Sequence, residues 1–169
     1  IVGKSTDNHI RRLVTHLNIL DRNHQLHIDI FDLYFRSEEK DFSYNKVYDT
    51  KHFFFRFLYK IKILRSLLNL LDVYISFFPV LKKQYDLVNI HSWNRISFFL
   101  YPLYRIICVQ LMISPWGSDV YRINAFDKVM AKFCYHRADY ISVPPINFRD
   151  DIAKIFNVSN RKFVNLGFG

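Results

Sequence analysis

The sequence of 169 residues is poor in glycine, proline and cysteine, with 4, 5 and 2 residues respectively. So little glycine and proline excludes a collagen-like or low-complexity chain. The longest stretch without a charged residue runs only from residue 106 to residue 118, whereas a membrane-spanning helix needs roughly 20 residues. We therefore expect no transmembrane helix. Cys108 and Cys134 lie in apolar runs, which favours buried thiols in a reducing compartment over a disulfide.

Acidic residues are also scarce. The sequence has 15 Asp and Glu but 24 Lys and Arg, which gives a net charge of +9. This excess favours an anionic partner, which includes nucleic acid, an acidic lipid surface and a phosphorylated small molecule. Half of the residues are hydrophobic, as expected of a folded domain. The opening residues lack the apolar core of a signal peptide, so we expect a cytoplasmic protein. An initial Ile and an abrupt end predict a single domain, residues 1–169, cut from a longer protein.

Strand-like and helix-like segments alternate along the chain. This order predicts parallel strands joined by helical crossovers, and hence a Rossmann-like α/β fold of about six strands with helices on both faces. Residues 36–50 are polar and are expected to form a loop, and Pro102 is expected to kink a helix or to lie near its start. The expected strands are residues 1–2, 26–31, 87–91, 106–113, 140–143 and 163–166, and the expected helices are residues 10–20, 51–78, 94–105, 126–133 and 148–156.

Ligands of such sheets bind beyond the carboxyl ends of the strands, which confines the search for a site to a few turns. The first turn contains Gly3, Lys4 and Thr6 and runs to Asn8, and it resembles the tail of a phosphate-binding P-loop. The earlier glycine of that motif would precede residue 1, and no later strand ends in the aspartate that would hold Mg²⁺. A glycine turn into a capped helix, open to a substrate, is the simpler interpretation.

Two further strand ends carry polar and aromatic side chains. His91 ends one strand, and the next strand leads into Trp116, Gly117, Ser118 and Asp119. An indole can stack on a sugar face and a carboxylate can accept hydrogen bonds from hydroxyls, although a tight turn with Asp119 as a helix cap explains the same residues. The seven histidines show no metal-ligand spacing, so we expect no metal site.

Residues 51–83 are strongly basic and aromatic. At helical spacing Lys51, Lys62 and Arg65 share one face, opposite a row of leucines. A basic amphipathic helix can lie on anionic lipid, whereas a helix packed on the core with a solvated basic face is the alternative. No nucleic-acid-binding module surrounds these residues, so we expect no nucleic-acid partner.

Five segments in order resemble the N-terminal domain of GT-B glycosyltransferases, in particular the retaining family 4 type. The likeness covers nearly the whole chain. It rests on residues 5–17 (STDNHIRRLVTHL), 85–92 (YDLVNIHS), 114–121 (SPWGSDVY), 137–143 (RADYISV) and 163–169 (FVNLGFG). Many relatives carry a histidine where this chain has Trp116, and the donor-binding domain with its paired glutamates is absent from the sequence.

The resemblance implies that this chain is the acceptor-binding half of a hexosyltransferase of surface polysaccharide or glycolipid synthesis, without a cofactor and inactive alone. Its C-terminal domain would bind most of the nucleotide-sugar, and the acceptor would be a glycan or lipid-linked. His91 and Asp119 would orient hydroxyls as the catalytic pair, and Lys51, Lys62 and Arg65 would face the inner leaflet of the membrane. The substrate-binding set would be Gly3, Thr6, Asn8, Trp116, Gly117 and Ser118. A P-loop nucleotide-binding fragment and a non-catalytic basic module are the alternatives.

Overall fold

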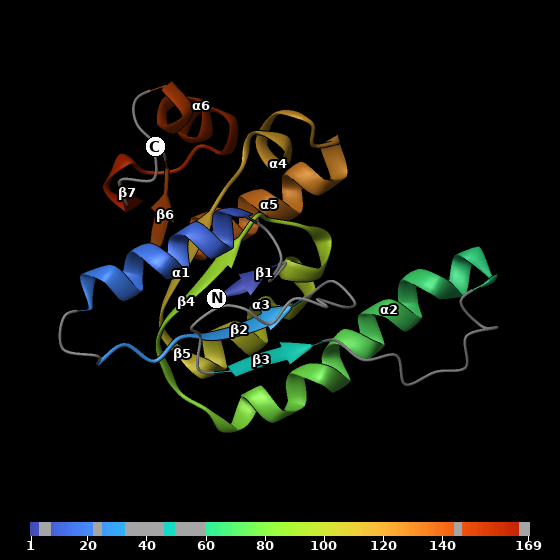
Figure 1. Cartoon of the computed structure of the whole chain (residues 1–169). Helices are drawn as coiled ribbons and strands as arrows, with labels where there is room; N and C mark the ends of the chain where they lie inside the picture. The colour runs from blue at the N-terminus through green and yellow to red at the C-terminus, as the bar shows by residue number, and fades with distance from the viewer. Residues whose placement is uncertain (4–7, 22–24, 33–45, 50–59, 144–146, 166–169) are drawn as a thin grey trace. The chain divides into compact units, whose positions relative to one another are not determined.

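The computed structural model alternates strands with helices along the chain (Figure 1). It describes residues 1–3, 8–21, 25–32, 46–49, 60–143 and 147–165. The chain divides into two compact units, Ile1–Lys83 and Gln84–Gly169. All strand pairs within each unit that the structure describes are parallel, which confirms an α/β protein built on parallel strands.

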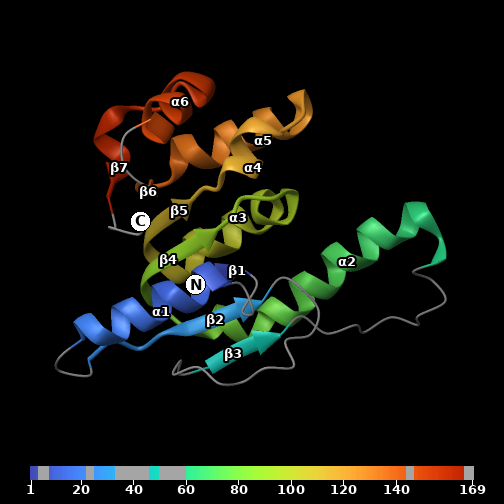
Figure 2. The same ribbon diagram turned by 45° about the horizontal axis from the view of Figure 1, so that its top comes forward.

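The first unit contains three strands in the order β3-β2-β1, which lie side by side in Figure 2. They are β1 (Val2–Gly3), β2 (Asp29–Asp32) and β3 (Lys46–Asp49). The prediction of a loop over residues 36–50 is wrong for β3. Lys46–Asp49 is only four residues long, which is too short to show the alternating pattern of a strand. Its pairing with β2 therefore decides its conformation.

Helices cover both faces of these three strands because successive side chains of β2 point to opposite sides. Ile30 packs with Ile10 and Val14 of α1 (Asn8–Leu20). The next residue, Phe31, meets Phe77 of α2 (Lys62–Phe77) edge to face, with the ring centroids 4.8 Å apart. The helical spacing of apolar residues 10–20 therefore predicted α1 correctly.

The helix α2 ends where Pro79 follows, and the 3₁₀ helix η2 (Phe78–Lys82) continues the chain. The predicted break before Pro79 is confirmed. Residues 51–59 of the predicted helix lie outside the described residues. By length and composition alone, Leu64–Lys82 passes the test for a membrane-spanning helix, with a mean hydropathy of 1.4 and 33% of it buried. Buried Asp72 interrupts this apolar segment, which is why the longest uncharged run did not reveal it.

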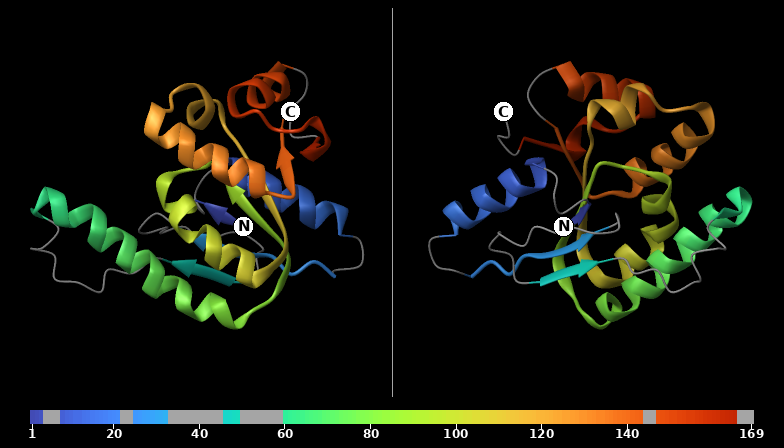
Figure 3. Two further views of the ribbon diagram at one scale, coloured as in Figure 1. Left: turned by 180° about the vertical axis from the view of Figure 1, so that it is seen from behind. Right: turned by 45° about the vertical axis from the view of Figure 1, so that its right-hand side comes forward.

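The second unit is a four-stranded parallel sheet in the order β4-β5-β6-β7. Its strands are β4 (Tyr85–His91), β5 (Cys108–Ser114), β6 (Tyr140–Ser142) and β7 (Phe163–Val164). The helices α3 (Arg95–Ile107) and α5 (Ala125–Arg137) lie together against one face of this sheet (Figure 3). Phe98 and Phe133 join these helices edge to face at 5.5 Å, and Tyr135 stacks on Phe156 of α6 (Asn147–Phe156) at 4.7 Å.

The boundary between α3 and β5 and the place of Pro102 differ from the sequence prediction. The apolar run from residue 106 was expected to be all strand, but its first two residues complete α3. Pro102 lies inside α3 with an exposed ring, so the helix continues past it. Apolar composition alone does not separate the end of a buried helix from the start of a buried strand. Helix α4 (Gly117–Tyr121) and the 3₁₀ helix η3 (Asn160–Lys162) complete this unit.

Candidate functional site

The candidate site lies where β4 and β5 end side by side. His91 is paired with Ser114 in the sheet register, so the two turns that follow these strands start at the same edge. The Ser114 hydroxyl donates to the Asn89 side-chain oxygen at 2.8 Å, and the backbone N–H of Ser92 donates to the Ser114 carbonyl at 3.0 Å. The sequence prediction that these strand ends lie together is therefore confirmed for His91, Trp116 and Asp119.

Asp119 fastens the two turns to each other. One carboxylate oxygen accepts the backbone N–H of Trp93 at 2.6 Å, and the other accepts the backbone N–H of Trp116 at 2.5 Å. The second bond caps α4, because Asp119 is the third residue of that helix and Trp116 precedes its first. Asp119 is 8% exposed, so both of its oxygens are committed to backbone groups inside the protein. This geometry makes Asp119 a positioning residue for the loop, and its predicted contact with acceptor hydroxyls stays a prediction.

Burial changes the acidity of this carboxyl group. Removal from water raises the pKa of Asp119 from 3.8 to about 6, although hydrogen bonds from the Trp93 and Trp116 backbone and from the Ser92 side chain act in the opposite direction. Desolvation wins because a carboxylate loses more solvation than neutral donors restore. Near neutral pH the link between the two turns therefore depends on a buried charge.

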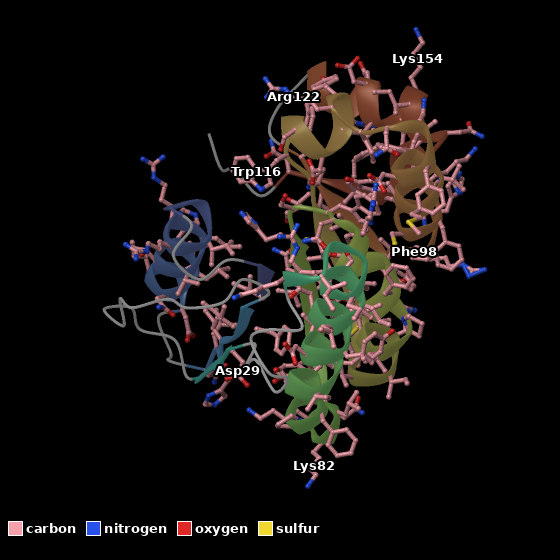
Figure 4. The ribbon with its side chains drawn as sticks, turned by 90° about the vertical axis from the view of Figure 1, so that its right-hand side faces the viewer. Asp29, Lys82, Phe98, Trp116, Arg122 and Lys154 are labelled. Atoms are coloured by element: carbon pink, nitrogen blue, oxygen red, sulfur yellow. The ribbon has the colours of Figure 1, made fainter. Side chains whose placement is uncertain are left out.

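Trp116 is oriented by His91. The indole Nε1–H donates to His91 Nε2 at 3.2 Å, and the two rings meet edge to face with centroids 5.2 Å apart. In this bond His91 Nε2 is the acceptor, so that nitrogen offers a lone pair to the indole. His91 is 8% exposed, whereas Trp116 is half-buried beside α4 (Figure 4). In this structure His91 acts through Trp116, and its direct action on a hydroxyl stays a prediction.

Ser92 joins β4 to this turn in a left-handed conformation, with φ of 65°. A non-glycine residue pays about 1 kcal/mol for that conformation, and such strain concentrates at functional turns. Its backbone bond to Ser114 and its side-chain bond to Asp119 hold it there. Sequence reasoning missed Ser92 and Asn89, since neither positive φ nor a contact between strands leaves a local pattern.

Gly117 and Ser118 present the solvent side of the site. Both are exposed at the first turn of α4. A Cβ atom added at Gly117 would lie 3.7 Å and 4.0 Å from two atoms of the Tyr121 ring, which is ordinary contact. The described residues around Gly117 therefore leave room for a small side chain. The face of an indole can stack on a sugar ring, and an exposed hydroxyl next to it can exchange hydrogen bonds with the sugar.

The remaining predicted residues lie in the first unit. Gly3 ends β1, where it pairs with Asp32, and Asn8 begins α1. Thr6 and Lys4 lie outside the described residues, as does Lys51, and the side chain of Lys62 is not described. Arg65 is exposed on α2. The roles predicted for all of these residues stay predictions. The prediction that no later strand ends in an aspartate is wrong, because β2 ends at Asp32 and β3 at Asp49, and the P-loop alternative itself stays a prediction.

Neither cysteine has the acidity of a reactive thiol. Both Cys108 and Cys134 are free and buried, as the sequence predicted. Burial raises the pKa of the Cys134 thiol to about 11, and it also raises that of Cys108. Among the residues that the structure describes, no cluster of three or more histidine, cysteine or carboxylate side chains could hold a metal ion.

A scan against protein-family models finds no match for this sequence, and a search of curated proteins finds none either.

Proposed function

We propose that this chain is the acceptor-binding half of a glycosyltransferase that uses a nucleotide-sugar. The observation that carries the proposal is the presentation of Trp116 at the carboxyl edge of a parallel sheet, with its indole oriented by His91 and its turn fastened by Asp119. Ligands of α/β sheets bind at this edge, and an ordered indole beside an exposed hydroxyl suits a sugar ring. In this proposal the fold is Rossmann-like and forms one half of a GT-B enzyme.

In the proposed reaction each half of the enzyme binds one of the two substrates. The acceptor oxygen bonds to the anomeric carbon of the donor, and the bond from that carbon to the nucleotide phosphate breaks. The departing nucleotide keeps the electron pair of that bond, and its phosphate oxygen takes up the proton of the acceptor hydroxyl. Trp116 stacks on the acceptor sugar, and Ser118 exchanges hydrogen bonds with its hydroxyls. His91 and Asp119 hold these groups in place, which lowers the entropic cost of forming the reactive complex. The resemblance in sequence favours retention of the anomeric configuration, and the proposed location of the enzyme is the cytoplasm.

Two measurements test this proposal. The full-length protein is supplied with a panel of nucleotide-sugars and glycan or lipid-linked acceptors, and release of the nucleotide is followed. We expect turnover with at least one donor and none from residues 1–169 alone. Absence of turnover by the full-length protein with every pair would refute a glycosyltransferase.

Acceptor binding by the chain itself is followed by isothermal titration calorimetry, which needs no tryptophan signal. Trp116→Phe is expected to weaken acceptor binding at least tenfold, because the smaller ring loses stacking area and the bond to His91. Phe126→Leu is the matched control, since Phe126 is an exposed aromatic residue of α5, 63% accessible, in the same unit. Equal affinities for Trp116→Phe, Phe126→Leu and the unaltered chain would contradict the placement of the site.

A further inference from the structure

The helix α2 carries an apolar face that the described residues of its own unit leave exposed. Leu64, Leu67, Leu71, Ile75 and Phe78 recur every three or four residues, so they form one stripe along the helix. Their exposed fractions run from 37% to 65%. Apolar side chains scattered singly over a surface are ordinary, but a contiguous stripe of about four turns indicates a binding surface. We call these five residues the α2 stripe.

Charged residues are scarce along the α2 stripe, and basic residues lie at both of its ends. Between Ser66 and Leu81 the only charged residue is Asp72, which is fully buried on the inner side of the helix. Basic residues stand at both ends, with Lys60 and Arg65 exposed near the start and Lys82 exposed at the finish. Lys82 extends away from the ribbon at the end of η2 (Figure 4). An apolar stripe between basic ends matches the acyl region and the anionic headgroups of a lipid leaflet.

The opposite side of α2 is committed to its own unit. Val73 and Phe77 are buried there, and Phe77 packs on Phe31 of β2. Leu68 is also buried, and it lies at the edge of the α2 stripe because it follows Leu64 by four residues. A helix that spanned the bilayer would meet lipid or other membrane helices around its whole circumference, so this packing would have to be lost. Although Leu64–Lys82 passes the length and composition test for a span, only one side of it is available to lipid. The geometry therefore favours a helix that lies in the plane of the interface.

We propose that α2 docks the protein on an anionic lipid surface, with the α2 stripe inserted among the acyl chains and Lys60, Arg65 and Lys82 on the headgroups. This inference does not depend on the proposed sugar transfer, because the α2 stripe and the candidate site lie on different units. In this proposal the α2 stripe contacts the lipid, in place of the basic face predicted from the sequence. The leucines of the α2 stripe, opposite that basic face, insert into the lipid, and Arg65 lies beside them.

The test is flotation of the 169-residue chain with vesicles. Vesicles of phosphatidylcholine with roughly one third phosphatidylglycerol are compared with vesicles of phosphatidylcholine alone. The double variant Leu67→Glu/Phe78→Glu changes two of the most exposed residues of the stripe, 54% and 65% accessible, so its fold is expected to survive. Val129→Glu on α5, where Val129 is 70% accessible, is the matched control for the loss of an exposed apolar residue.

We expect the unaltered chain and Val129→Glu to bind the anionic vesicles, and the double variant to bind at least tenfold more weakly with an unchanged circular dichroism spectrum. A tenfold loss is the minimum because burial of even one such side chain contributes about that factor. No binding of the unaltered chain to anionic vesicles would overturn the proposal. Equal binding by the double variant, or equally strong binding to the neutral vesicles, would also overturn it. Dimerisation that depends on the α2 stripe, without vesicle binding, would reassign the stripe to a second copy of this chain.

The depth of insertion separates a helix that lies in the interface from one that spans the bilayer. Leu71→Cys is labelled with an environment-sensitive fluorophore, and Cys108 and Cys134 escape the label because both are buried. On anionic vesicles we expect a blue shift and quenching by lipids brominated near the headgroup. Quenching only by lipids brominated near the bilayer centre would indicate a span and would contradict an interfacial helix.

Discussion

The buried carboxylate of Asp119 makes the stability of the second unit depend on pH in an unusual direction. Its pKa is raised from 3.8 to about 6 in the folded protein, so the native state holds this proton more tightly than the unfolded chain. The contribution of Asp119 to stability is therefore complete below pH 4 and is lost as the pH rises through 6. The difference between these two pKa values corresponds to roughly 3 kcal/mol of unfolding free energy.

Asp119→Asn isolates this effect. The amide keeps the shape of the side chain and one acceptor oxygen but carries no charge, while its NH₂ group faces one of the two backbone N–H donors of Trp93 and Trp116. The lost bond costs about 1–3 kcal/mol at every pH. The difference in unfolding free energy between the two proteins should therefore shift by roughly 3 kcal/mol in favour of the variant between pH 4 and pH 7.

The assay is urea unfolding at a series of pH values, followed by far-ultraviolet circular dichroism. All other titrating groups are shared by the two proteins, so their contributions cancel in the difference. Asp119→Ala serves as the second variant, because it leaves both backbone donors without the carboxylate and should lose about 1–3 kcal/mol for each. Parallel stability profiles for the unaltered chain and Asp119→Asn would refute the reasoning that burial of Asp119 sets this dependence.

Two further predictions concern polar groups in the second unit. The Tyr135 side chain is fully buried, and its hydroxyl has no hydrogen-bond partner within the described part of the chain, so Tyr135→Phe should raise the unfolding free energy by about 1 kcal/mol. A loss of stability on chemical denaturation would show that the hydroxyl is satisfied. His91→Leu removes the acceptor for the Trp116 indole and should cost about 1–3 kcal/mol and lower the fluorescence anisotropy of Trp116, whereas His91→Gln, which keeps an acceptor, should do less. Equal effects of both substitutions would contradict a role for that hydrogen bond.

The local pattern of the sequence was sufficient for most regular elements. Apolar residues at helical spacing identified α1 and α5, and β-like runs that end at His91 and Val143 located β4 and β6 to within a few residues. The alternation of strands and helices also predicted parallel pairing. It did so because a parallel neighbour can be reached only by a crossover, which this order of segments supplies.

Some features had no local signal at all. β3 is a short strand whose conformation depends on pairing with β2, and the boundary between α3 and β5 falls inside one continuous apolar run. For α2, the spacing separated leucines from basic residues but did not show which side the unit would cover. Only the tertiary structure shows that Leu68 is buried and Leu67 exposed.

For the candidate site, the sequence by itself determined which residue types stand at the ends of β4 and β5, because strand ends follow from local hydrophobic patterning. The tertiary structure alone decided what those residues do. Through hydrogen bonds to residues far apart in the chain, Asp119 links two turns and His91 orients Trp116. A side chain's chemistry is fixed by its type, but its role depends on which groups the fold brings within about 3 Å of it.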